Sequence, residues 1–166
     1  MTTSNNRRTI KALIVGIIGC FFTLIFLTNL VDYQSNFAFV QHVLSMDTIF
    51  PWSTLVSRAI TSPMWWTIAY WAIIITEGIT ALLCIVWAIK MLSNVRDLTR
   101  YTISKKWAYR GLFLCFALFT FGFVVVWWEW FAMRQSDTRN GLEAATRVMI
   151  MTWIGILILA SHDVDM

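Results

Sequence analysis

The fold is decided by residues 64–92, MWWTIAYWAIIITEGITALLCIVWAIKML, an apolar run with one carboxylate, Glu77, near its middle. A helix that crosses a bilayer needs about 20 apolar residues at a rise of about 1.5 Å each, so this run is long enough to cross with residues to spare. An acid near the middle of a bilayer costs on the order of 2.5–3.5 kcal/mol on insertion scales. The run therefore predicts a membrane-spanning helix in which Glu77 has a specific role.

The helical periodicity of this run indicates where Glu77 points. At about 100° per residue, the face of Glu77 also carries Tyr70, Thr80 and several small residues. The opposite face carries the bulky aliphatic residues Ile68, Ile75, Ile79, Leu82 and Val86. Bulky aliphatic side chains suit lipid, whereas small and polar side chains suit contact with other helices. We therefore expect Glu77 to point into a helix bundle.

Two roles for Glu77 remain open. The first is structural: a neutral acid whose hydrogen bond holds two helices in register. The second is a site that takes up and releases a proton or a cation. Because no charged residue is expected at the same depth, we expect a mainly neutral carboxyl with hydroxyl or backbone partners. The candidate intramembrane polar site comprises Glu77, Thr80, Tyr70, Thr23 and Thr152.

Composition and hydropathy predict an all-α, four-helix transmembrane bundle that forms a single domain. Of the 166 residues, 58% are apolar and 13% are charged, which excludes an ordinary soluble globule and a disordered chain. The predicted spans are residues 12–30, 64–92, 107–130 and 143–160. A short apolar segment between the first two spans is too short to cross, so it is expected to be an external helix at the interface.

The charged residues flank the spans and predict their orientation. Segments 1–11 and 90–106 together hold eight Lys and Arg residues, whereas 31–63 holds one and 129–147 holds three. The positive-inside rule then places both termini and the connection between the second and third spans in the cytoplasm. The net charge of +4 is explained in this way, and nucleic acid is not an expected partner.

The connection between the first two spans carries a resemblance. Residues 35–51, SNFAFVQHVLSMDTIFP, followed by residues 57–63, SRAITSP, and then by the helix with Glu77, resemble a bacterial family of predicted small integral membrane proteins. That family is a domain of unknown function. The resemblance implies four spanning helices and supplies no activity, substrate or cofactor. The polar positions that match the family pattern are Asn36, His42, Asp47, Arg58 and Glu77.

A second group of polar residues is expected at the external ends of the helices. This candidate external polar site comprises His42, Asp47, Arg58, Glu129 and Arg147. At α-helical spacing, Glu129 shares a face with Gly111, Cys115 and Gly122, so we expect it to point inward. Glu143 and Arg147 are four residues apart and are expected to pair. The group is interpreted either as a network that locks the third and fourth spans, or as a polar vestibule leading to Glu77.

No residue pattern predicts a cofactor, a metal site or catalytic residues. His42 and His162 are expected at opposite membrane surfaces, separated by roughly the 30 Å hydrocarbon core, so they cannot share one haem or metal. The three cysteines, Cys20, Cys84 and Cys115, all fall inside apolar runs and are expected to be inert.

Three functions are compatible with the sequence. The leading hypothesis is a non-enzymatic accessory or interaction subunit in contact with lipid, whose partner is another membrane protein or a second copy of the chain. A dense group of tryptophans near the external boundary offers a surface for such contacts: Trp65, Trp66, Trp71, Trp127, Trp128 and Trp130. The alternative is a proton-coupled small transporter or channel that uses Glu77. A membrane enzyme acting on lipid through His42 and Asp47 is a third hypothesis, which no catalytic motif supports.

Overall fold

The computed structural model describes residues 3–163, and within that range it contains helices and no strand. Four helices are long and apolar enough to cross a membrane. The elements in chain order are α1 (Thr3–Val31), α2 (Tyr33–Ser45), η1 (Thr54–Arg58), α3 (Pro63–Ser93), α4 (Leu98–Ala117), η2 (Leu118–Trp130), η3 (Met133–Gln135) and α5 (Leu142–Ala160). The helices α4 and η2 follow each other without a break and form the third long helix. The predicted four-helix bundle, with an added helical segment between its first two spans, is confirmed.

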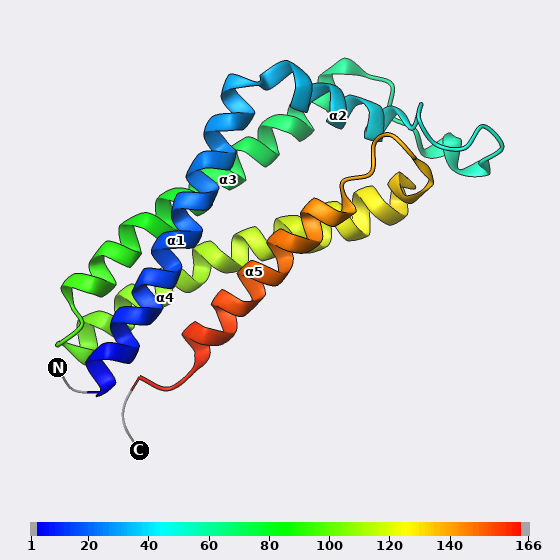
Figure 1. Cartoon of the computed structure of the whole chain (residues 1–166). Helices are drawn as coiled ribbons and strands as arrows, with labels where there is room; N and C mark the ends of the chain where they lie inside the picture. The colour runs from blue at the N-terminus through cyan, green and yellow to red at the C-terminus, as the bar shows by residue number, and fades with distance from the viewer. Residues whose placement is uncertain (1–2, 164–166) are drawn as a thin grey trace.

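The long helices form two pairs that separate toward one end of the molecule. Figure 1 shows α1 beside α3 and η2 beside α5, with both described chain ends at the same end of the bundle. We call this the proximal end and the opposite end the distal end. At the distal end, α2 follows α1 directly and packs on α3. The backbones of the two pairs are therefore farther apart in their distal halves than in their proximal halves, and α2 and the loops lie at the distal end (Figure 1).

Helix α3 is the centre of the proximal half because glycines let its neighbours approach closely. A Cβ on Gly19 of α1 would lie 3.0 Å from the Cβ of Cys84, and one on Gly111 of α4 would lie 2.9 Å from the Cβ of Leu83. Small residues of this kind are what allow close helix packing within a bilayer. The proximal core is filled around these contacts by buried residues such as Phe22, Cys84 and Leu112.

Burial along α3 confirms the predicted orientation of its faces. Glu77, Tyr70 and Thr80 are buried, with exposed fractions of 3%, 2% and 0%. Ile75 and Leu82, on the opposite face, are exposed by 54% and 64%. The carboxyl therefore points into the bundle, and the aliphatic face is left for lipid.

An ion-pair cluster at the proximal end ties the two ends of the described chain together. The Asp163 carboxylate accepts a hydrogen bond of 2.6 Å from Lys11 Nζ and another from Lys105 Nζ. Arg8 donates to the backbone oxygens of Asp163 and Val95, at 3.1 and 2.9 Å. Burial alone would raise the pKa of the Asp163 carboxyl, but the two lysines outweigh burial and hold its pKa below the ordinary value of 3.8. The first helix, the start of α4 and the C-terminal tail are thus held together by charge.

Candidate intramembrane site at Glu77

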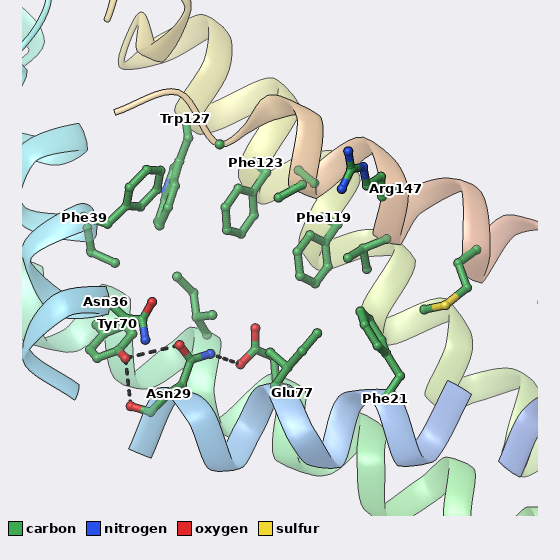
Figure 2. A pocket seen from close by; sticks show the side chains of 18 residues that line it. Phe21, Asn29, Asn36, Phe39, Tyr70, Glu77, Phe119, Phe123, Trp127 and Arg147 are labelled. Carbon is green, nitrogen blue, oxygen red and sulfur yellow. Dashed lines mark hydrogen bonds between the residues drawn. The ribbon is translucent and has the colours of Figure 1, made fainter. Parts of the chain in front are cut away.

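Glu77 is the centre of a hydrogen-bonded chain between α1 and α3. The Nδ2 of Asn29 donates to Oε2 of Glu77 at 2.6 Å. The Tyr70 hydroxyl donates to the backbone oxygen of Asn29 at 2.9 Å and lies 3.3 Å from its side-chain Oδ1. No hydrogen bond joins the other carboxyl oxygen, Oε1, to a described residue. Figure 2 shows the Glu77 carboxyl directed into the space above it, between α3 and the aromatic residues of η2.

That space is a cavity of about 640 Å³ in the distal half of the bundle. Its floor is made by α1 and α3 with Asn29, Tyr70 and Glu77, and α2 contributes Asn36 and Phe39. The remaining walls come from η2 and α5 and are mostly apolar. The polar groups are therefore gathered on one side of a largely apolar chamber, an arrangement typical of small-molecule sites.

The aromatic wall of the cavity depends on how η2 is wound. Residues Leu118–Trp130 form a π-helix, in which the amide of Phe131 donates to the carbonyl five residues earlier, Val126, at 2.9 Å. The rings of Phe119, Phe123 and Trp127 follow one another along this helix, with centroids 5.0 and 4.4 Å apart. All three line the cavity opposite Glu77 (Figure 2). π-helical turns are rare and often occur at functional sites.

The prediction that a hydroxyl or backbone group bonds to the Glu77 carboxyl was wrong. Instead, the side-chain amide of Asn29 donates a hydrogen bond to it. Thr23 donates to the Gly19 carbonyl of its own helix at 2.9 Å, and Thr152 donates to the Val148 carbonyl of its own helix at 2.8 Å. The hydroxyl oxygen of Thr80 is buried and has no hydrogen-bond partner among the described residues. Of the predicted intramembrane site, only Glu77 and Tyr70 share one hydrogen-bonded network.

Asn29 was not predicted as the partner of Glu77, because it was assigned to the end of the first span. It is two residues from the end of α1, whereas Glu77 is central in α3. Their contact means that the two helices are offset along their length, so Glu77 lies toward the distal end of α1. One signal was available in the sequence: Asn29 is a polar residue inside the apolar run that ends at Leu30.

The predicted external polar site does not form one cluster. His42 pairs with Asp47 at 2.9 Å. Arg58 donates to the Trp130 carbonyl at 3.2 Å, and its guanidinium lies 4.7 Å from the centre of the Trp130 ring. The remaining two residues form ion pairs within the sequence neighbourhood: Arg134 with Glu129 at 2.5 Å, and Arg147 with Glu143. None of these contacts among the described residues joins η2 to α5, which argues against the locking network.

Two details of the external group bear on the cavity at Glu77. The expectation that Glu129 points inward was wrong: its side chain is 59% exposed. The π-helical winding of η2 explains this error: Glu129 lies seven residues after Gly122, a spacing that returns to the same face in an α-helix but not in a π-helix with its wider turns. Arg147 alone among the five predicted external residues lines the cavity. Of the residues proposed to form a polar vestibule leading to Glu77, only Arg147 therefore reaches the cavity.

The described residues contain no group of three or more His, Cys, Asp or Glu side chains arranged to hold a metal ion. The polar side of the cavity has instead one carboxyl, amides and a phenol, which are hydrogen-bonding groups. Such a set can bind and orient a molecule and can exchange a proton with it.

Comparison with known proteins identifies a family match for most of the chain. Residues 7–162 match the family model described as "Predicted small integral membrane protein (DUF2165)", a domain of unknown function. No curated protein and no solved structure matches the chain. The family match agrees with the four membrane-spanning helices and adds no activity to them.

Proposed function

The chain belongs to the family of predicted small integral membrane proteins (DUF2165), and we propose that it is a non-enzymatic protein that binds a small amphipathic molecule at Glu77. The observation that carries this proposal is the cavity of about 640 Å³ with a buried carboxyl and amide on one side. A purely structural acid would be enclosed by its partners. Glu77 instead has one oxygen held by Asn29 and a carboxyl that lines an unfilled space.

Proton exchange follows from the same geometry. A carboxyl that is neutral when the cavity is empty can release its proton when a bound molecule supplies a positive charge or a hydrogen-bond donor. Binding of the molecule and binding of the proton would then compete at Glu77. This competition is the elementary step of a proton-coupled carrier, and it supports the transport function over an inert scaffold.

An open channel fits the packing less well than a carrier. The proximal half of the bundle is filled by buried side chains from all four spans, including Phe22, Cys84, Leu112 and Leu159. Gly19 and Gly111 bring α1 and α4 into close contact with α3 in the same half. A molecule at Glu77 therefore needs a rearrangement of the helices to reach the proximal end.

A role as an accessory subunit is the second candidate, and it is supported by a separate surface. In the loop between α2 and α3, the Phe50 and Trp52 rings stack at 5.2 Å, and Trp52 is 78% exposed. Aromatic side chains of this kind anchor in the lipid interface or contact a membrane-protein partner or a second copy. We also propose that the proximal end faces the cytoplasm of a bacterial inner membrane, because the segments richest in Lys and Arg lie there.

The binding function is tested by what the protein carries out of its native membrane. Wild-type protein would be purified in a mild detergent beside Glu77→Gln, Ile25→Trp and Leu24→Trp, and organic extracts would be compared by mass spectrometry. Ile25 lines the cavity, whereas Leu24 is 64% exposed on the same helix and does not line this cavity, so Leu24→Trp is the matched control. We expect one small amphipathic compound in the wild type and the control, and its depletion in the other two variants. Equal extracts from all four proteins would refute binding at Glu77. A protein that retains its stoichiometric partner and its role after Glu77→Gln would favour the accessory function.

A further inference from the structure

The rim of the Glu77 cavity lies between α1 and α5. Most cavity residues are buried or half-buried, and the exposed ones are Phe21 on α1 with Ala144 and Arg147 on α5. Figure 2 shows Phe21 and Arg147 at the same end of the cavity, on opposite sides, away from Asn36 and Phe39. The cavity thus reaches the surface of the bundle through a gap between two membrane-spanning helices. Lipid surrounds the bundle at that level, since the neighbouring exposed residues are aliphatic, such as Leu24 and Ile150.

A second hollow begins where the cavity opens. It is a groove of about 540 Å³ along α1 and α5, and its lining residues are almost all aliphatic: Ile14, Ile17, Ile18, Ile150, Ile154 and Ile158, with Met151, Gly155 and Arg147. Arg147 and Met151 line both hollows. At Gly155 the two helices come close, because a Cβ there would lie 2.8 Å from Cδ1 of Ile18. The groove therefore runs from the mouth of the cavity past this contact, as far as Ile14 and Ile158.

Together, the cavity and the groove match the shape and polarity of an amphipathic molecule with one alkyl chain. The cavity offers hydrogen-bonding groups at Glu77 and Asn29, whereas the groove offers only hydrocarbon beyond Arg147. The positive charge of Arg147 at the junction is offset by its ion pair with Glu143. A polar head in the cavity and an alkyl chain in the groove would each have a matching environment.

The chemistry around Glu77 favours a bound molecule whose polar head group carries hydrogen-bond donors and a positive charge. Oε1 of Glu77 accepts no hydrogen bond from a described residue, so an acceptor is available in the cavity. The rings of Phe123 and Trp127 line the opposite wall, and aromatic faces attract cations. A carboxylate that pairs with an ammonium group in a low-dielectric cavity also cancels its own charge.

We infer that the molecule bound at Glu77 is a long-chain primary amine that enters from the bilayer between α1 and α5. Its ammonium group would lie at Glu77 beneath the aromatic wall, and its chain would lie in the groove of isoleucines. This inference rests on the proposed function and adds to it the class of the ligand and the route of entry.

The test uses dodecylamine that carries a photoreactive diazirine at the middle of its chain. Purified full-length protein would be labelled in detergent, and labelled peptides would be mapped by mass spectrometry. We expect labels on α1 and α5 along the groove, and displacement of the probe by unlabelled dodecylamine but not by dodecanoate. Glu77→Gln should weaken amine binding by about tenfold, as expected when a charged hydrogen bond is lost. Labels elsewhere on the chain, or equal displacement by dodecanoate, would overturn the inference.

A second pair of variants tests whether the amine enters between α1 and α5. Ala144→Trp places a large ring at the rim, whereas Leu157→Trp changes a residue of the same helix that is 53% exposed and lines neither hollow. Lateral entry predicts that Ala144→Trp slows or abolishes labelling and that Leu157→Trp does not. If Ala144→Trp labels at the wild-type rate, entry between α1 and α5 is wrong. In that case a compound found in native extracts and lost in Ile25→Trp would still support binding at Glu77, so the two failures are distinguishable.

Discussion

The side-chain amide of Asn29 donates a hydrogen bond of 2.6 Å to the carboxyl of Glu77 and so joins the distal end of α1 to the middle of α3. Replacing Asn29 with Ala leaves the carboxyl oxygen without its donor inside the bundle. An unsatisfied buried polar group costs about 1–3 kcal/mol, so we expect a loss of this size in the free energy of unfolding. The measurement is unfolding in mixed detergent micelles followed by circular dichroism. Thr28→Ala, at an exposed neighbouring position, is the control and should unfold like the wild type.

A double-mutant cycle isolates the contact between the two residues. Asn29→Ala and Glu77→Gln should show an interaction energy of about 0.5–3 kcal/mol, the range found for residues in one hydrogen-bonded network. The matched pair is Asn29→Ala with Thr152→Val, because Thr152 bonds only to carbonyls of its own helix. Additive effects in the first pair, as in the second, would mean that the Asn29–Glu77 bond does not stabilise the bundle.

The two glycines of the third long helix should respond differently to a methyl group. Gly111→Ala places a Cβ 2.9 Å from the Cβ of Leu83, which lies next to the backbone and cannot swing away. Overpacking of this kind typically costs about 1–3 kcal/mol, so we expect a lower midpoint of thermal unfolding. Gly122→Ala meets only the end of Leu118 at 3.6 Å and should leave the midpoint unchanged or raise it. Equal midpoints for the two variants would contradict the close contact of α4 with α3.

Stability should fall at acid pH through Asp163. Its pKa is held below 3.8 in the folded protein by Lys105 and Lys11, against the opposing effect of burial. The ionised form therefore stabilises the fold fully above the unfolded-state pKa, and this contribution is lost as the pH falls through the lower, folded pKa. Asp163→Asn removes the contribution at every pH and leaves the buried Lys11 and the half-buried Lys105 without their carboxylate, which costs up to about 3 kcal/mol at pH 7.

The check is the midpoint of thermal unfolding of the wild type and Asp163→Asn between pH 7 and pH 3. The difference between the two proteins should be largest at pH 7 and should shrink as the solution becomes acid. Asp97→Asn is the control, because Asp97 pairs with Arg100 at 3.3 Å where both side chains are largely exposed. A constant difference across the range would show that the Asp163 carboxylate does not titrate with folding.

The parts of the structure that follow from helical periodicity could be predicted from the sequence. The burial of Glu77, Tyr70 and Thr80 and the exposure of the opposite face of α3 depend only on residue spacing within one helix. The number of long helices follows from the length of the apolar runs in the same way.

The parts that depend on how elements meet could not be predicted in this way. The partnership of Asn29 with Glu77 results from the offset between α1 and α3, which close contacts such as Gly19 with Cys84 set in three dimensions. The exposure of Glu129 results from the π-helical winding of η2, which a fixed angle of about 100° per residue misplaces. The pairing of His42 with Asp47 joins α2 to the loop after it, and a turn at Met46 with a left-handed backbone brings them together.

The ion pair between Asp163 and Lys11 holds the start of the first helix and the segment after the last helix at the same end of the molecule. Two copies can therefore be encoded as a single tandem polypeptide, since a short polar linker from one copy to the next need not traverse the membrane. Such a concatemer would allow Glu77 to be changed in one copy only, so that the number of acids required per working unit can be counted directly.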